Sequence, residues 1–408
     1  MPPANSCAPR YDASSHHGRD PDGRHDGPAA HRAGPDPLRL RHPARRRRDG
    51  RPRSRSGPAR LRLPPPALRR GRKPLRHPHP ERGRARGGDT ANRRPHLCFA
   101  GHTDVVPPGE GWSRDPFGAE VADGILYGRG ATDMKGGVAA WVAAVTDAVR
   151  DGTAEDATLS LLITGDEEGV ATDGTARVLD WMEAHGHVPD MCLVGEPTSV
   201  AALGDTIKIG RRGSLSARIT VHGTQGHVAY PDRCDNPVHR LVRALHDLVA
   251  TPLDHGTDWF GPSTLQVTTI DVGNITGNIV PAQATARLNI RFNDRHSAAS
   301  LERRVRDILE AEAPRHDVTF ECSGESFLTQ PGPFVDALRR AVAATTGQDA
   351  RLDTGGGTSD ARFITRLCPV AELGAVGTTM HKVDERTPVE ELRQLATLYR
   401  AVIRECLA

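Results

Sequence analysis

Three short apolar segments of this chain each end in histidine or acidic residues. The segments are residues 97–100 before His102 and Asp104, residues 158–163 before Glu167 and Glu168, and residues 191–194 before Glu196. Helical patterns separate them at residues 138–149 and 172–185. Short apolar runs that alternate with helices are typical of an α/β sheet, whose ligands bind at the carboxyl ends of the strands. The sequence therefore predicts an α/β fold with polar side chains gathered at one edge of a sheet.

Each of these polar groups also has an ordinary structural explanation when it is considered alone. His102 and Asp104 lie on the same side of an extended segment, which suits either a metal ligand with an orienting carboxylate or a surface pair. Asp133, just before the helix pattern, suits a helix cap as well as a ligand. Residues 166–168 suit a solvated acidic turn. Their repetition at three strand ends favours a metal site.

The first 94 residues differ in composition from the rest of the chain. They hold 25 Lys and Arg against 8 Asp and Glu, whereas residues 95–408 hold 29 against 43. Residues 37–88 are rich in Arg, Pro, Gly and His and show neither helical nor strand periodicity. Three interpretations are open: a disordered tail, an arginine-rich nucleic-acid arm centred on residues 45–48, or translation in a shifted frame. Because the basic charge is confined to this segment, nucleic-acid binding by the acidic body is not expected.

A shifted frame is compatible with the genetic code. Residues 71–78 can be back-translated so that a slip of one base gives Val-Glu-Asn-Leu-Tyr-Ala-Thr, an ordinary strand-like sequence. Codon degeneracy allows this alternative without requiring it. Sequencing the coding DNA tests it, since an alternative frame full of stop codons would exclude it.

Cysteine usage and hydropathy predict a cytoplasmic protein. The seven cysteines are scattered and lack C-x-x-C spacing, so neither a disulfide framework nor a thiolate zinc site is indicated. No apolar run approaches the ~20 residues that a membrane span requires, and the amino terminus has no apolar signal region. We therefore expect no membrane partner.

Residues 211–324 have a different pattern from the segments on either side. Strand patterns and helix patterns follow one another in the order β-α-β-β-α-β, at residues 215–222, 236–250, 265–272, 284–292, 298–313 and 316–322. This order predicts a ferredoxin-like module. We interpret it as an insertion into the α/β domain, which then comprises residues 95–210 and 325–408.

Six side chains at strand ends and in loops form a candidate metal-binding set: His102, Asp133, Glu167, Glu168, Glu196 and His381. Two histidines and three carboxylates suffice for two zinc ions with one carboxylate bridging, and the remaining acid is then a candidate for proton transfer.

At this point the sequence resembles the dinuclear zinc aminoacylase/carboxypeptidase family. The segments that carry the resemblance are Gly101-His-Thr-Asp-Val-Val-Pro107, Gly128-Arg-Gly-Ala-Thr-Asp-Met-Lys-Gly136, Asp166-Glu-Glu-Gly169, Val194-Gly-Glu-Pro197, Arg211-Arg-Gly-Ser214, Gly226-His-Val-Ala-Tyr-Pro231, Gly356-Gly-Thr-Ser-Asp360 and Met380-His-Lys-Val-Asp-Glu385. They run in order from about residue 95 to the carboxyl terminus. The resemblance implies a mixed-sheet, zinc-exopeptidase-like catalytic domain with an inserted ferredoxin-like α+β lid and dimerisation domain.

The resemblance also implies roles for the candidate set. His102 and Glu196 would hold one zinc ion, Glu168 and His381 the other, and Asp133 would bridge them, with cobalt as a possible substitute. Asp104 would orient His102, and Glu167 would act as the general base. A cis peptide bond is expected after Asp133.

The same resemblance implies a substrate and a partner. Within the family, the matching segments imply hydrolysis of the succinyl amide of N-succinyl-L,L-2,6-diaminopimelate, a step towards lysine and diaminopimelate. Its carboxylates would be bound by Arg211, Ser214, Tyr230, Asn278, Arg291, Gly357 and Thr358. His227 would reach the partner subunit's site, which implies a homodimer. The alternatives are a deacylase of acetylornithine or another N-acyl amino acid, and an inactive product with a damaged amino terminus.

Overall fold

The structure is a computed structural model that describes residues 94–408. The three interpretations of the amino-terminal segment fall on residues 1–93 and thus lie outside the described residues. No helix in the described part combines the length and the apolar composition needed to cross a membrane.

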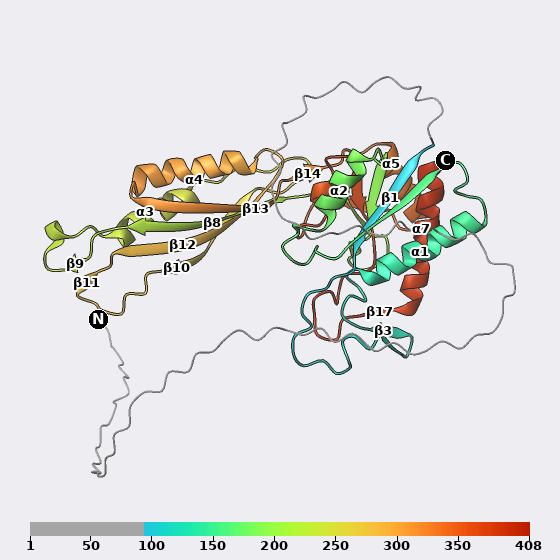
Figure 1. Cartoon of the computed structure of the whole chain (residues 1–408), viewed down its shortest axis with the longest axis horizontal. Helices are drawn as coiled ribbons and strands as arrows, with labels where there is room; N and C mark the ends of the chain where they lie inside the picture. Colours follow the sequence, from blue (N-terminus) through green and yellow to red (C-terminus); the bar gives the residue numbers. More distant parts are fainter. Residues whose placement is uncertain (1–93) are drawn as a thin grey trace, which may run out of the picture. The chain divides into compact units, whose positions relative to one another are not determined.

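A six-stranded mixed sheet in the order β15-β6-β16-β5-β1-β4 forms the centre of the α/β part (Figure 1). Its strands are β1 (His96–His102), β4 (Thr158–Thr164), β5 (Met191–Val194), β6 (Thr206–Lys208), β15 (Arg351–Asp353) and β16 (Val370–Glu372). β1 pairs in parallel with both β4 and β5, so the three strands that end in candidate site residues are neighbours. The predicted α/β class with a mixed sheet is confirmed.

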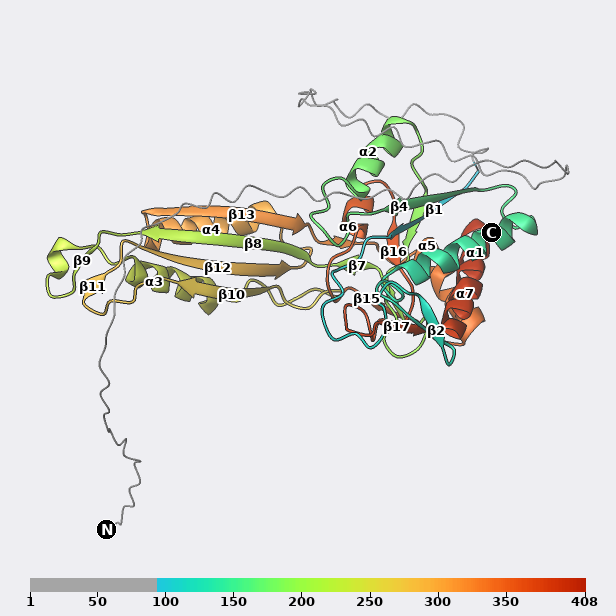
Figure 2. The same ribbon diagram turned by 60° about the horizontal axis from the view of Figure 1, so that its bottom comes forward.

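Helices cover both faces of this sheet, as Figure 2 shows. On one face lie α1 (Lys135–Arg150), α5 (Pro333–Thr346) and α7 (Val389–Leu407), and on the other lie α2 (Thr175–Ala184) and α6 (Ala361–Ile364). Alternate residues of β1 pack in the hydrophobic cores on the two faces of the sheet. Phe99 packs with Trp141 and Tyr399 on the α1 side, whereas Ala100 packs on the α2 side. Full burial of a side chain such as Phe99 stabilises the fold by roughly 1.5–3 kcal/mol. β1 is therefore anchored on both faces directly before His102.

Glycine at position 101 lets β1 approach the start of α1 closely. A Cβ atom there would lie 2.7 Å from Met134 Cε and 3.0 Å from Val138 Cγ2. Larger residues would push apart the strand that carries His102 and the segment that carries Asp133. Gly101 thus allows β1 to pack closely against the start of α1.

β4 forms one edge of the central sheet within the described residues, because it pairs with β1 alone. Leu161 and Ile163, on its α1 side, are 47% and 36% exposed. This edge therefore presents an uncharged, partly apolar strand to the solvent.

A separate four-stranded antiparallel sheet follows, in the order β10-β12-β8-β13. Its elements in chain order are β8 (Gly213–His222), α3 (Pro237–Ala250), β10 (Thr264–Asp271), β12 (Gln283–Phe292), α4 (Ala298–Glu312) and β13 (His316–Gly324). The alternating residues Leu215, Ala217 and Ile219 of β8 face a core shared with α3 and α4. Both the chain order and the strand order are those of a ferredoxin-like module. Its function as a lid or dimerisation domain, and the domain boundaries given above, stay predictions.

Short ladders complete the described part. β7 (Gly210–Arg211) pairs with β14 (Phe327–Leu328) where the chain enters and leaves the ferredoxin-like module. β9 (Gly226–His227) pairs with β11 (Ile279–Val280), and β3 (Ile125–Tyr127) pairs with both β2 (Glu120–Ala122) and β17 (Arg386–Pro388). A short 3-10 helix, η2, spans Pro231–Arg233.

Candidate metal centre

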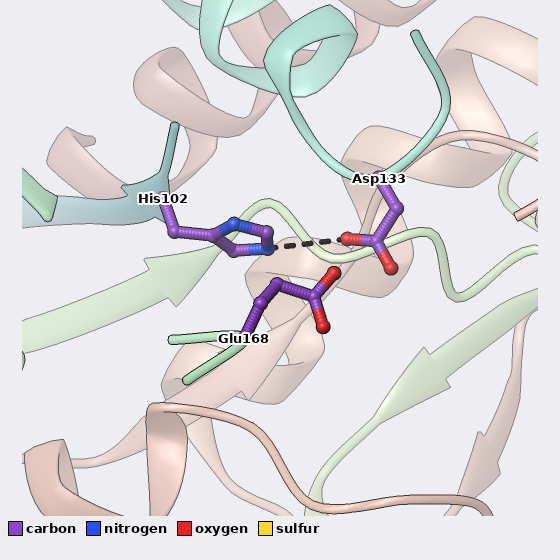
Figure 3. A group of neighbouring side chains, drawn as sticks. All are labelled: His102, Asp133 and Glu168. Carbon is purple, nitrogen blue, oxygen red and sulfur yellow. Dashed lines mark hydrogen bonds and ion pairs between the residues drawn. The ribbon is translucent and has the colours of Figure 1, made fainter. Parts of the chain in front are cut away.

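The carboxylate of Asp133 lies between two histidines. Its Oδ1 is 3.2 Å from His102 Nε2, and its Oδ2 is 3.3 Å from His381 Nε2. Figure 3 shows His102 and Glu168 directed towards the same carboxylate. One oxygen for each histidine is the arrangement that a carboxylate bridging two cations requires.

Four structural elements bring these groups together. His102 ends β1, Asp133 precedes α1, Glu168 follows β4, and Glu196 follows β5. The Asp133–Met134 peptide bond is cis, as the resemblance implied. His381 comes from the loop before β17 and has a φ of 61°, in the left-handed region. Its Nε2 also lies 2.9 Å from Glu168 Oε1.

Asp104 connects His102 with the loop after β4. Its Oδ1 lies 3.4 Å from His102 Nδ1, and its backbone carbonyl oxygen is 3.0 Å from the same nitrogen. Its other carboxylate oxygen accepts a hydrogen bond of 3.0 Å from the backbone N–H of Glu168. These contacts hold Nδ1 on the Asp104 side and leave His102 Nε2 directed at Asp133 and Glu196.

The site concentrates negative charge in a buried place. Burial opposes the charge on His102, but the hydrogen bond to Asp133 and the charges of Glu196, Asp133 and Glu167 raise the pKa of His102 to about 10. Burial, with the nearby Asp133 carboxylate, raises the pKa of Glu196 well above its usual range. Burial is also the main reason that the pKa of Glu167 is raised to about 7, with Asp360 and Glu168 adding to it.

The donor set fits divalent cations. Within residues 94–408, two groups of three side chains have ligand atoms within 4.8 Å of one another: His102, Asp133 and Glu168, and His102, Glu167 and Glu196. None of the four glutamate and aspartate side chains in these groups forms an ion pair with a lysine or arginine in that part of the chain. Imidazole and carboxylate ligands suit zinc, and buried carboxylates require a compensating positive charge. The residues therefore fit a dinuclear metal centre.

A cavity of about 540 Å³ opens beside these ligands. Its lining includes Asp133, Glu167, Glu168, Glu196 and His381. Three of the predicted substrate-binding residues, Arg211, Gly357 and Thr358, also line it. The structure thus brings these three of the predicted substrate-binding residues beside the candidate metal ligands.

The other predicted substrate residues belong to the ferredoxin-like module and do not line this cavity. Ser214 is buried at the start of β8, where its hydroxyl accepts a hydrogen bond from Asn289. Arg291 donates to the Asn289 side chain, and Asn278 accepts a backbone hydrogen bond from Val228. Tyr230 is exposed, and its ring lies against His227 with centroids 5.7 Å apart. Within one chain, the structure does not bring His227 or these four residues to the metal-binding cluster.

Arg211 has a structural partner that sequence reasoning missed. Its Nε donates to both oxygens of Glu372, at 3.0 and 3.1 Å, and its Nη2 also donates to this carboxylate. Ser359 Oγ donates to the same carboxylate at 2.6 Å. Arg211 is therefore held in place before any substrate arrives. Lys208, paired with Asp353, also lines the cavity and was not predicted.

Asp360 is a second group that the motifs alone did not reveal. It is 5% exposed, and its Oδ2 accepts hydrogen bonds from Thr175 and Thr164. Its charge is one of the causes of the raised pKa of Glu167. A lone aspartate after a glycine-rich loop gave no local signal of this placement.

An α/β sheet that gathers histidines and carboxylates around a cavity at its carboxyl edge defines the class of α/β metallohydrolases. More narrowly, the chain belongs to peptidase family M20/M25/M40, whose sequence model matches residues 98–405.

Curated relatives share much of the described sequence. A succinyl-diaminopimelate desuccinylase from Gluconacetobacter diazotrophicus is 60% identical over 314 residues, which cover 77% of this chain and 82% of the relative. A protein of the same name from Rhodospirillum centenum is 53% identical over 339 residues, covering 83% of this chain and 88% of the relative.

Solved structures share the fold at lower identity. The aminopeptidase PepT from Bacillus cereus matches with a TM-score of 0.63 and 22% identity, covering 78% of this chain and 83% of that one. The metallo-carboxypeptidase Sso-CP2 from Sulfolobus solfataricus matches with a TM-score of 0.61 and 16% identity. The match covers 78% of this chain and 86% of that one. These likenesses concern the fold alone.

Proposed function

We propose that this chain is a zinc-dependent amidohydrolase that converts N-succinyl-L,L-2,6-diaminopimelate into succinate and L,L-2,6-diaminopimelate. The relatives named above support this substrate, because they share 53–60% of the aligned residues. The reaction supplies diaminopimelate for lysine synthesis, and we expect it to take place in the cytoplasm.

The observation that carries the proposal is the position of Asp133 between His102 and His381. In the proposed centre, His102 and Glu196 would hold one zinc ion, His381 and Glu168 would hold the other, and Asp133 would bridge them. His102 Nε2 is 3.9 Å from Glu196 Oε1, so each histidine has a glutamate of its own within reach. When bound, the zinc ions polarise the amide carbonyl and lower the pKa of the attacking water.

Glu167 is the proposed proton-transfer residue. It lines the cavity, and one of its carboxylate oxygens lies within the same group of ligand atoms as His102 and Glu196. Its carboxylate takes a proton from the attacking water and returns it to the amine nitrogen as the amide bond breaks. Asp104 keeps His102 in the orientation that directs Nε2 at Asp133 and Glu196.

Substrate recognition is proposed to involve both the cavity and a second subunit. Arg211, Gly357 and Thr358 line the cavity, and the Arg211 guanidinium and the backbone of the other two would bind a carboxylate of the substrate. His227, Tyr230, Asn278 and Arg291 belong to the ferredoxin-like module and would complete the site of the partner in a homodimer. Ser214, at the start of β8, would also take part in binding the substrate.

A substrate assay tests the proposal. Full-length protein loaded with zinc is incubated with N-succinyl-L,L-2,6-diaminopimelate or with N-acetylornithine, and released amine is measured before and after EDTA treatment. We expect EDTA-sensitive release from the succinyl substrate. Release from acetylornithine alone would replace the substrate assignment, and release from neither would reject the activity.

A further inference from the structure

Glu385 is a buried carboxylate for which the proposed reaction has no direct use. Its side chain is 0% exposed, and both of its oxygens accept hydrogen bonds. Oε2 accepts from Arg129 Nη1 at 2.7 Å and from the backbone N–H of Gly130 at 3.1 Å. Oε1 accepts from the backbone N–H groups of Thr132 and Asp133, at 2.9 and 3.1 Å. A buried charge with four donors is fully compensated and holds its surroundings rigidly.

These hydrogen bonds join two loops that are far apart in the sequence. Glu385 lies on the loop that carries His381, and its donors lie on the loop that carries Asp133. The backbone carbonyl of Glu385 also accepts a hydrogen bond from Gly128 N–H at 3.0 Å. Thr132 Oγ1 donates to the carbonyl of Arg386 at 3.1 Å. The Glu385 carboxylate is therefore one of several contacts that hold the two loops together, and it is the one that reaches the Asp133 backbone.

Arg129 extends this connection to a third loop. Its Nη2 donates to the Pro108 carbonyl at 3.1 Å, and its guanidinium lies 5.2 Å from the Trp112 ring. Arg129 is 3% exposed, so it and Glu385 form a pair shielded from water. Residues after His102 are thus tied to the same carboxylate.

Glu385 fixes the backbone that carries the Asp133 side chain, because it accepts the N–H groups of Thr132 and Asp133. Both Asp133 oxygens face histidines.

We propose that Glu385 is a positioning residue that fixes Asp133 between His102 and His381, so that both Asp133 oxygens are available to the two metal ions. This inference rests on the proposed dinuclear centre but not on the identity of the substrate. Glu385 acts through the Thr132 and Asp133 backbone, without contact to the reacting atoms.

The test is the metal affinity of a Glu385→Gln variant of the full-length chain. This change preserves the shape of the side chain but places an amide –NH₂ where one oxygen accepted backbone N–H groups. Loss of a group that orients a metal ligand typically weakens metal binding by roughly 10- to 100-fold. We expect the affinity for zinc to fall by that factor, measured by competition with a chromophoric chelator, and the absorption spectrum of the cobalt-loaded protein to change.

An Asp254→Asn variant is the matched control. Asp254 is also a buried carboxylate that accepts several hydrogen bonds, from Gly256, Ser263, Asn293 and His296, but it belongs to the ferredoxin-like module. Its replacement should lower the melting temperature and leave the zinc affinity and cobalt spectrum unchanged. If Glu385→Gln fails to fold, Glu385→Asp, which keeps the charge but shortens the reach, is measured in the same way.

The outcomes separate this inference from the proposed function. Weakened zinc binding in a folded Glu385 variant, with normal binding in the control, supports the positioning role even if the succinyl substrate is not hydrolysed. Zinc affinity within about twofold of wild type in Glu385→Gln or, where that does not fold, in Glu385→Asp would overturn it.

Discussion

Asp133 Oδ2 and His381 Nε2 lie 3.3 Å apart although the two residues come from opposite ends of the catalytic part of the chain. Asp133 presents its other oxygen to His102, so its replacement should affect both proposed metal positions. We predict that Asp133→Ala binds less than one zinc ion per chain, whereas His381→Ala retains one. Elemental analysis after gel filtration measures the stoichiometry. Two retained zinc ions in Asp133→Ala would contradict the bridging role.

Replacement of Glu167 should separate catalysis from metal binding. We predict that Glu167→Gln keeps both zinc ions and a nearly unchanged KM but loses about 10²- to 10⁴-fold in kcat, which is the usual contribution of general acid–base catalysis. Stopped amide-hydrolysis assays combined with elemental analysis check this. The control is Asp166→Asn, a half-buried neighbour whose carboxylate accepts a hydrogen bond from the Asp173 backbone N–H and which should keep full activity. Near-wild-type turnover in Glu167→Gln would remove Glu167 from this role.

Breaking the Arg211–Glu372 ion pair should lower the stability of the fold. This loss can be measured without any substrate. Glu372 is fully buried, and its replacement by Gln leaves the guanidinium of Arg211 without its counter-charge. Removal of one partner of a buried ion pair costs about 3–5 kcal/mol. Denaturant unfolding should show a loss of this size for Glu372→Gln. A variant as stable as wild type would mean that the pair does not hold Arg211 in place.

The lowered pKa of Asp254 should make the stability of the fold decrease as the pH falls. Burial alone would raise its pKa, but hydrogen bonds from Ser263, Gly256 and Asn293 outweigh it and hold the pKa of Asp254 well below its usual range. A carboxyl group whose pKa is lowered by folding stabilises the fold above its unfolded pKa, about 4, and loses this contribution as the pH falls. Melting temperatures measured from pH 7 down to pH 3 should therefore fall more steeply for wild type than for Asp254→Asn. Parallel curves would refute this assignment.

We expect the protein to self-associate through the edge strand β4 as its concentration rises. Its exposed Leu161 and Ile163 lie on a strand that has one neighbour within the described residues. Lysine on an edge strand is a common means of preventing edge-to-edge pairing. We predict that Leu161→Lys lowers the fraction of large species in sedimentation velocity at high protein concentration, while zinc content stays unchanged. The control is Val170→Lys, which replaces an exposed valine outside the strand. Equal effects of both variants would exclude a specific role of the β4 edge.

The local sequence pattern was sufficient to predict the candidate site residues that follow strands. His102, Glu168 and Glu196 follow apolar strands, and parallel neighbours in a sheet place their carboxyl ends together. His381 follows no strand and has left-handed backbone geometry. It joined the candidate set as a loop histidine, and only the resemblance to the family paired it with Glu168. The order of elements likewise predicted the ferredoxin-like module, whose strands β8 and β12 alternate between buried and less buried residues along most of their length.

Long-range polar contacts were not predictable in this way. Glu385 follows Lys382 and Asp384 in a charged turn and has the local appearance of a surface residue, yet its partners are backbone N–H groups near Asp133. Glu372 ends a short buried strand, and nothing nearby in the sequence indicates Arg211 as its partner. Such pairs depend on which loops the fold brings together, which no local periodicity encodes. The roles proposed for His227 and Tyr230 would likewise require a second subunit, which no local pattern encodes.

The most direct measurement for the proposed centre is anomalous diffraction at the zinc edge from crystals of the zinc-loaded full-length protein. We predict two anomalous peaks, one between Asp133, His102 and Glu196 and the other between Asp133, His381 and Glu168. A single peak, or peaks that do not share Asp133 as a ligand, would contradict a dinuclear centre bridged by this residue.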